Sequence, residues 1–114
     1  MLDRMLRMAL LIDFYGALLT PRQRMCLELY FHQDLSLAEI AGELAVSRQA
    51  VHDMINRATG VLEEYETRLG LIRMDSERRR SVADILAVLD RLEAGCRTCQ
   101  DGLTRIRRLV THLA

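Results

Sequence analysis

Five polar side chains of the types that read nucleic-acid bases fall within one ten-residue stretch: Arg48, Gln49, His52, Asn56 and Arg57. Arginine makes paired hydrogen bonds to guanine, and glutamine and asparagine make them to adenine, at base edges in the major groove of DNA. On a helix these side chains project away from the apolar residues of the same stretch, which are Val51, Met54, Ile55 and Ala58. The pattern predicts a binding face on the polar side of one helix.

The segment from Asp34 to Arg57 predicts two short helices joined by a tight turn. In its first half four apolar residues recur at the spacing of one helix face: Leu37, Ile40, Ala41 and Leu44. Ser36 and Glu39 have the spacing of a capping box, in which each side chain satisfies a backbone N–H of the first turn. The turn falls near residues 44–46, and Ser47 can cap the second helix. This is the pattern of a helix-turn-helix, whose second helix enters the major groove.

The charge of this segment does not favour tight, autonomous DNA binding. Between Asp34 and Arg57 there are four acidic residues and two arginines, whereas neutralised phosphates supply most non-specific affinity. Two hypotheses therefore stay open. In one the motif binds DNA or a structured RNA, and in the other it is a protein-interaction surface. For the first, the predicted nucleic-acid-binding residues are Arg22, Gln23, Arg24, Ser47, Arg48, Gln49, His52, Asn56 and Arg57, of which residues 22–24 contact the backbone.

Other reactive residues give no consistent site for a metal, a cofactor or catalysis. Cys96 and Cys99 have the spacing of half a zinc site, but no second cysteine pair exists. His112 would lie roughly 20 Å from Cys99 along one helix. Both cysteines, and Cys26, are expected in the core as reduced thiols. Ser47 beside His52 is the sole nucleophile and base pair, and Ser47 is already explained as a cap. We expect a protein that is not an enzyme.

The first third of the chain predicts two further helices. One runs from about Leu2 to Tyr15 and ends at Gly16. The next is capped by Thr20, has proline at its first position and glutamine at its third, and ends near residue 32 or 33.

Two long apolar stripes follow. The first extends the second motif helix to a stop at Gly70, through Val51, Ile55, Ala58, Leu62, Tyr65, Leu69 and Ile72. The apolar register is lost from Arg73 to Arg80, which predicts a connector with a densely basic patch at residues 78–80. The second stripe comprises Val82, Ile85, Leu89, Leu92, Cys96, Cys99, Leu103, Ile106, Val110 and Leu113.

The second stripe fits one helix or two. We predict two, broken between about Glu93 and Thr98, because glycines stand at 95 and 102. An apolar edge of this length must be covered, either by the first stripe or by a second copy, so a homodimer is expected. The organisation predicted is a helix-turn-helix domain over residues 1–72 and a helical C-terminal extension over residues 73–114.

Composition agrees with an all-α fold. Of 114 residues 50% are hydrophobic and 4% aromatic, the net charge is zero, and every one of the sixteen basic residues is arginine. No targeting segment or membrane span is evident, because Asp3, Arg4, Arg7 and Asp13 interrupt the apolar N-terminal stretch. The cytoplasm is the expected location.

The chain resembles the YlxM family of small bacterial helix-turn-helix proteins from Ile12 to Leu71. The resemblance lies in DFYGALLTPRQR, LYFHQDLSLAEIAGELAVSRQAV and LEEYETRLGL. The central part is also similar to the promoter-reading C-terminal domain of sigma factors. The family resemblance implies a regulatory role in the signal recognition particle pathway. We expect this role to act through nucleic-acid binding, through contacts with particle components such as its GTPase, or through both, with DNA or a structured RNA such as that of the particle as the nucleic acid. The alternatives are a sigma-like DNA-binding regulator and a purely protein-interaction module.

Overall fold

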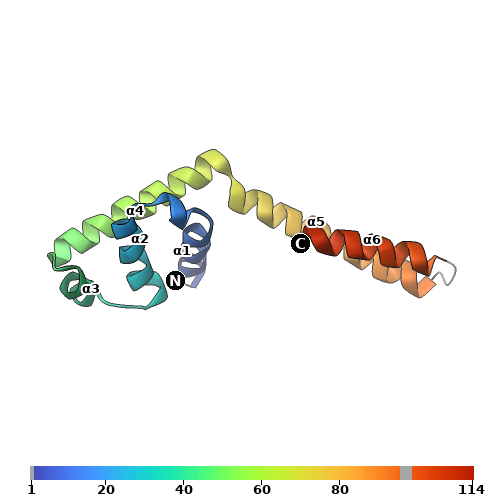
Figure 1. The fold of residues 1–114 in the computed structure, drawn as a ribbon, viewed down its shortest axis with the longest axis horizontal. Helices are drawn as coiled ribbons and strands as arrows, with labels where there is room; N and C mark the ends of the chain where they lie inside the picture. Colours follow the sequence, from blue (N-terminus) through green and yellow to red (C-terminus); the bar gives the residue numbers. More distant parts are fainter. Residues whose placement is uncertain (1, 96–98) are drawn as a thin grey trace. The chain divides into compact units, whose positions relative to one another are not determined.

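The computed structural model describes residues 2–95 and 99–114, which are almost entirely helical and contain no strand. In chain order its elements are α1 (Leu2–Tyr15), η1 (Gly16–Leu18), α2 (Pro21–Leu27), η2 (Glu28–His32), α3 (Leu37–Leu44), α4 (Arg48–Leu69), α5 (Leu71–Gly95) and α6 (Gln100–Leu113) (Figure 1). The predicted all-α fold is confirmed. The chain divides into two compact units, Met1–Ile72 and Arg73–Ala114, and each is described by itself.

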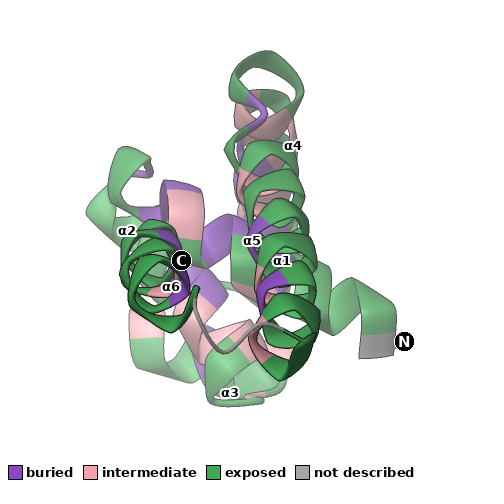
Figure 2. Ribbon diagram, turned by 90° about the vertical axis from the view of Figure 1, so that its right-hand side faces the viewer, coloured by how far each residue is buried: buried purple, intermediate pink, exposed green. Residues whose placement is uncertain are grey.

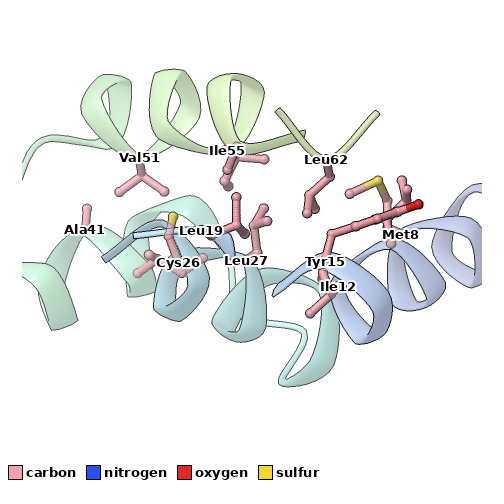
Figure 3. Close-up of a cluster of buried hydrophobic side chains, with 13 residues drawn as sticks. Met8, Ile12, Tyr15, Leu19, Cys26, Leu27, Ala41, Val51, Ile55 and Leu62 are labelled. Carbon is pink, nitrogen blue, oxygen red and sulfur yellow. The ribbon is translucent and has the colours of Figure 1, made fainter. Parts of the chain in front are cut away.

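The first unit is built around α4, which packs against α1, α2 and α3. Its core is aliphatic apart from Tyr15 and Cys26, and contains Met8, Leu11, Ile12, Tyr15, Leu19, Cys26, Leu27, Ile40, Ala41, Val51, Ile55, Ala58 and Leu62 (Figure 3). In Figure 2 purple bands of buried residues alternate with green, exposed residues along the helices. Most of the first predicted stripe therefore lies in this core, although Leu69 is exposed.

The second helix begins and ends where predicted, but its last part has a wider turn than expected. The Gln23 backbone N–H donates to Thr20 Oγ1 and the Thr20 N–H donates to Gln23 Oε1, both at 3.2 Å, so the capping box is formed. After Leu27 the helix widens into the π-helical turn η2, which ends at His32. The sequence predicted that end but not the wider turn.

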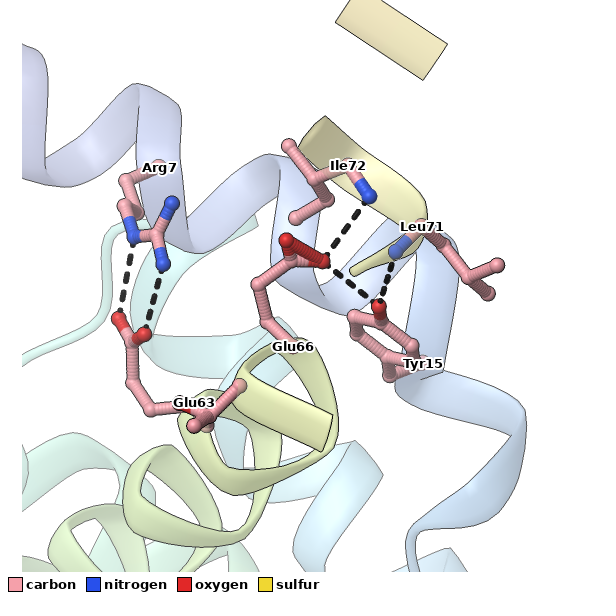
Figure 4. A network of polar contacts seen from close by, with 7 residues as sticks. Arg7, Tyr15, Glu63, Glu66, Leu71 and Ile72 are labelled. Carbon is pink, nitrogen blue, oxygen red and sulfur yellow. Dashed lines mark hydrogen bonds and ion pairs between the residues drawn. The ribbon is translucent and has the colours of Figure 1, made fainter. Parts of the chain in front are cut away.

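Gly70 ends α4 in the left-handed conformation, with φ 64°, and α5 begins at the next residue (Figure 4). The first N–H groups of α5 are satisfied by side chains of α1 and α4. The Leu71 N–H donates to Tyr15 Oη at 3.0 Å, and the Ile72 N–H donates to Glu66 Oε1 at 2.9 Å. The buried Tyr15 hydroxyl donates in turn to Glu66 Oε1 at 2.7 Å. This network caps α5 at its start.

The predicted connector from Arg73 to Arg80 is wrong, because α5 is helical throughout that stretch. Nearly every side chain of this stretch is exposed to solvent. The helix therefore has no buried face, and its sequence needs no apolar stripe. Ion pairs within the helix support it instead, from Arg78 and Arg79 to Asp75.

The second unit is an antiparallel hairpin of α5 and α6 (Figure 1). Val82, Leu89, Leu103 and Val110 are buried in it. Arg107 on α6 binds both Asp90 and Glu93 on α5, and these carboxylates raise the pKa of its guanidinium further above the ordinary value. The end of α5 at Gly95 lies within the predicted break.

The sequence predicts that all three cysteines lie in the core. Two of them can be described, and the prediction is correct for one. Cys26 is fully buried, and burial raises the pKa of its thiol. Cys99 is exposed and disulfide-bonded, so the expectation of a buried, reduced thiol is wrong there. Cys99 lies on the apolar stripe only if one helical repeat runs unbroken through it. That repeat is interrupted, because α6 begins only at Gln100. Cys96 lies outside the described residues.

Candidate nucleic-acid interface

The helix α3 begins at a capping box. The Glu39 N–H donates to Ser36 Oγ at 3.1 Å, and the Ser36 N–H donates to Glu39 Oε1 at 3.2 Å. Both bonds satisfy backbone N–H groups that have no partner within the helix, so Ser36 fixes where α3 begins. The residues Ile40 and Ala41 then face the core.

The turn between α3 and α4 depends on one residue with positive φ. Ala45 has φ 55° and ψ 46°, and its N–H donates to the carbonyl of Ala41. The Val46 N–H donates to the same carbonyl at 3.1 Å. The chain then reaches Ser47, whose Oγ accepts from the Ala50 N–H at 3.0 Å and caps α4. The predicted turn, cap and second helix are therefore all formed.

The first half of α4 is amphipathic. Val51, Ile55 and Ala58 are buried, and Met54 is half-buried. The polar residues of the same half are exposed, namely Ser47, Arg48, Gln49, His52, Asn56 and Arg57. Arg48 and Asn56 are both exposed to solvent, so both can meet a ligand.

Several of these polar side chains are held by their own helix. Gln49 Nε2 donates to Asp53 Oδ1 at 3.0 Å, and Asn56 Nδ2 lies 3.5 Å from His52 Nδ1. His52 is also 3.7 Å from the Asp53 carboxylate. Such exposed i,i+4 contacts are weak and exchange with water, so a ligand can replace them. Asp53 adds a negative charge to the middle of the face, which opposes phosphate binding.

Two hollows border this face. One, of about 450 Å³, lies between Leu37 of α3 and the side chains of Arg48, Gln49 and His52. The other, of about 590 Å³, has aromatic, aliphatic and polar walls, and its lining includes Arg4, Tyr30, Phe31, Leu35, His52 and Asn56. The rings of Tyr30 and Phe31 meet edge to face, with centroids 4.9 Å apart. Sequence reasoning missed the contribution of Arg4 and these rings, because residues from four separate segments meet there.

The three predicted backbone-contacting residues differ in what they can offer. Arg22 is exposed. Gln23 is half-buried and holds the cap of α2, and Arg24 pairs with Glu28 at 3.0 Å. Among these three, Arg22 is the best placed to contact a phosphate.

A metal centre or catalytic pair has little support in residues 2–95 and 99–114. No group of three or more histidine, cysteine or acidic side chains there could hold a metal ion. Ser47 makes its hydrogen bond as a helix cap, not to His52. In the same part of the chain, none of the helices combines the length and apolar character needed to cross a membrane.

Two helices joined by a left-handed turn, with a buried inner face and a polar outer face on the second, define a helix-turn-helix protein. The family described as "Putative helix-turn-helix protein, YlxM / p13 like" matches residues 2–100, and the chain belongs to it. A UPF0122 protein of Desulforamulus reducens is 46% identical over 104 residues, which is 91% of this chain and 87% of the relative. One of Exiguobacterium sibiricum is 53% identical over 89 residues, 78% of this chain and 83% of the relative. One of Geobacillus kaustophilus is 52% identical over 86 residues, 75% and 77% of the two chains. The predicted YlxM membership is thus confirmed.

Proposed function

We propose that this protein is a regulator that binds nucleic acid through the exposed face of α4 and acts in the signal recognition particle pathway. The observation that carries the binding role is the division of α4. The half that buries Val51, Ile55 and Ala58 presents arginine, glutamine, histidine and asparagine to solvent. The role is one of binding, not catalysis, and the cytoplasm is its proposed location.

We favour a structured RNA, such as that of the particle, as the ligand. A duplex-DNA reader relies on many neutralised phosphates, and the first unit carries ten acidic residues against seven arginines. RNA recognition relies more on unpaired bases, which stack on aromatic rings and bond through their edges. The 590 Å³ hollow offers Tyr30 and Phe31 beside the polar groups of His52 and Asn56, which suits such a base. The link to the particle itself is what membership of the YlxM family implies.

The exposed arginine at the start of α4 has the clearest role in this proposal. Arg48 lies one residue after the cap and borders the smaller hollow with Gln49 and His52. Its planar guanidinium can bond to a phosphate or to a guanine edge. Gln49 and Asn56 join it when their bonds within the helix are exchanged for bonds to a base.

Binding is tested by fluorescence anisotropy with three labelled probes: the hairpin RNA of the particle, a duplex promoter DNA, and a single-stranded RNA of equal length. We expect salt-dependent binding that is tightest for the hairpin RNA. The change Arg48→Ala should raise its Kd about ten-fold or more. Arg68→Ala is the matched control, because Arg68 is exposed on the same helix and pairs with Glu64. Equal affinities of wild-type protein and Arg48→Ala would contradict the proposed site.

A protein-interaction role is the second candidate, favoured by the acidic excess of the first unit. In that case the chain docks on the particle's GTPase or another protein component. Crosslinking in cells, followed by separate recovery of bound RNA, DNA and protein, distinguishes the two roles. Recovery of DNA alone would support a sigma-like regulator instead. Recovery of neither the particle's RNA nor its protein would remove the pathway from the proposal.

A further inference from the structure

The hairpin of α5 and α6 carries large aliphatic side chains that its own two helices leave uncovered. They are Ile85, Val88 and Leu92 on α5, and Ile106, Leu109 and Leu113 on α6. Each is 41–59% exposed, whereas Val82, Leu89, Leu103 and Val110 are buried between the helices. The hairpin therefore buries one edge of each apolar stripe and exposes the other.

All six exposed side chains lie on the same side of the hairpin. When the buried residues of each helix are taken as heptad position a, the exposed ones fall at d and g. Glu93 and Arg107 both fall at e, on the other edge of the stripe, and they bind each other. Because the e edges of the two antiparallel helices meet on one side, their d and g edges meet on the opposite side. We call this side the open face.

The open face is free of charge. From Ser81 to Gly95 on α5 and from Gln100 to Leu113 on α6, no residue at d or g is charged, and the positions not yet named are Ser81, Gly95 and Gly102. Charged and polar residues border it at position c, namely Asp84, Arg91, Arg105 and His112. An exposed apolar patch with a polar rim is typical of a protein interaction site.

We propose that the open face of a second copy covers this one, so that two chains join in a four-helix bundle. The two rows have identical spacing, since 85, 88 and 92 are separated by three and four residues, as are 106, 109 and 113. The row of α5 can therefore pack along the row of α6 from the other copy, and the reverse contact forms by symmetry. The sequence suggested a second possibility, in which the apolar stripe of α4 covers this face. That stripe is already buried, because Val51, Ile55, Ala58 and Leu62 lie in the core of the first unit.

The area agrees with a specific but modest dimer. Six half-exposed aliphatic side chains offer roughly 500–600 Å² per copy, and two copies bury on the order of 1,000–1,200 Å², which is the lower end for specific interfaces. We therefore expect a dimer that dissociates on dilution. This inference does not depend on nucleic-acid binding, since it concerns a different surface.

The test is sedimentation equilibrium of the full chain over a range of concentrations. The apparent mass should rise from that of one chain, 13.1 kDa, toward twice that value. Leu109→Glu puts a charge in the open face and should raise the dissociation constant at least ten-fold. Thr104→Glu is the matched control, because Thr104 is exposed on the same helix at position b, away from the open face. It should leave the constant within two-fold.

Circular dichroism of each variant checks that its helices are intact. If Leu109→Glu loses helix, the milder Leu109→Ala and Val88→Ala replace it and should each weaken the dimer measurably. A wild-type chain that keeps the mass of a monomer up to about 100 µM overturns the proposal, because a Kd weaker than that is not a specific dimer of this chain. Equal dissociation constants for Leu109→Glu and Thr104→Glu overturn it as well.

Discussion

Replacing Ala45 by glycine should stabilise the protein, although glycine normally weakens a helical domain. Ala45 has φ 55° in the turn between α3 and α4. A left-handed conformation costs a residue with a Cβ about 1–2 kcal/mol, and glycine does not bear that cost. Glycine also has more freedom in the unfolded chain, which removes roughly 0.5–1 kcal/mol of the gain. The net effect expected is a stabilisation of about 0.5–1 kcal/mol.

The same substitution at Ala38 is the matched control. Ala38 is exposed within α3, where its backbone is helical, so glycine brings no relief of strain and costs up to about 1 kcal/mol. For a domain the size of the first unit, 1 kcal/mol moves Tm by roughly 4–8 °C. The two variants should therefore move Tm in opposite directions.

Differential scanning calorimetry of the full chain measures both variants under identical conditions. Chemical denaturation followed by circular dichroism gives the free energy of unfolding independently. If Ala45→Gly melts at or below the temperature of Ala38→Gly, the backbone strain assigned to the turn is refuted.

Two further predictions concern the network at the start of α5. Tyr15→Phe should lower Tm by several degrees, because the Leu71 N–H and the Glu66 carboxylate both lose a buried partner. The control is Tyr65→Phe, which should change Tm little; the Tyr65 ring stacks on that of Tyr15, with centroids 5.9 Å apart. Equal effects of the two substitutions on Tm would contradict the role of the Tyr15 hydroxyl. Burial, reinforced by the bond to Glu66, raises the pKa of Tyr15 above its ordinary value of 10.0, so the folded chain keeps this proton at a pH where the unfolded chain has lost it. The stability that the protonated Tyr15 hydroxyl contributes is complete below about pH 10 and falls as the pH rises further. The difference in Tm between wild type and Tyr15→Phe should therefore shrink above about pH 10. A difference that stays constant would refute this linkage.

The helix starts and the helix-turn-helix could be predicted because their signals are local. Ser36 with Glu39, and Thr20 with Gln23, are three residues apart, and each pair fulfils its cap without help from the rest of the fold. The stop at Gly70 is local for the same reason, since glycine adopts positive φ without a steric penalty. The inner face of α4 followed from periodicity alone.

The remaining features depend on contacts between distant residues. The start of α5 is capped by Tyr15, which lies 56 residues before Leu71, and the sequence gives no sign of that bond. The stretch that follows reads as a connector because a fully solvated helix lacks an apolar stripe. The hollow beside His52 and Asn56 needs side chains from α1 and η2 as well as α3 and α4. A heptad stripe likewise predicts that a face is apolar but not whether the chain itself covers it, as the exposed Ile85 and Leu92 show.

The bond between Tyr15 and Glu66 also constrains how this sequence can change over generations. The two residues are 51 positions apart, yet one oxygen of Glu66 accepts from both the Tyr15 hydroxyl and the Ile72 amide, the second amide of α5. A chain that loses the tyrosine leaves the Leu71 amide without its side-chain acceptor, and a chain that loses the glutamate leaves the Tyr15 hydroxyl and the Ile72 amide without theirs. Neither position can drift alone without penalty, so sequence variation at the two sites should be correlated across lineages.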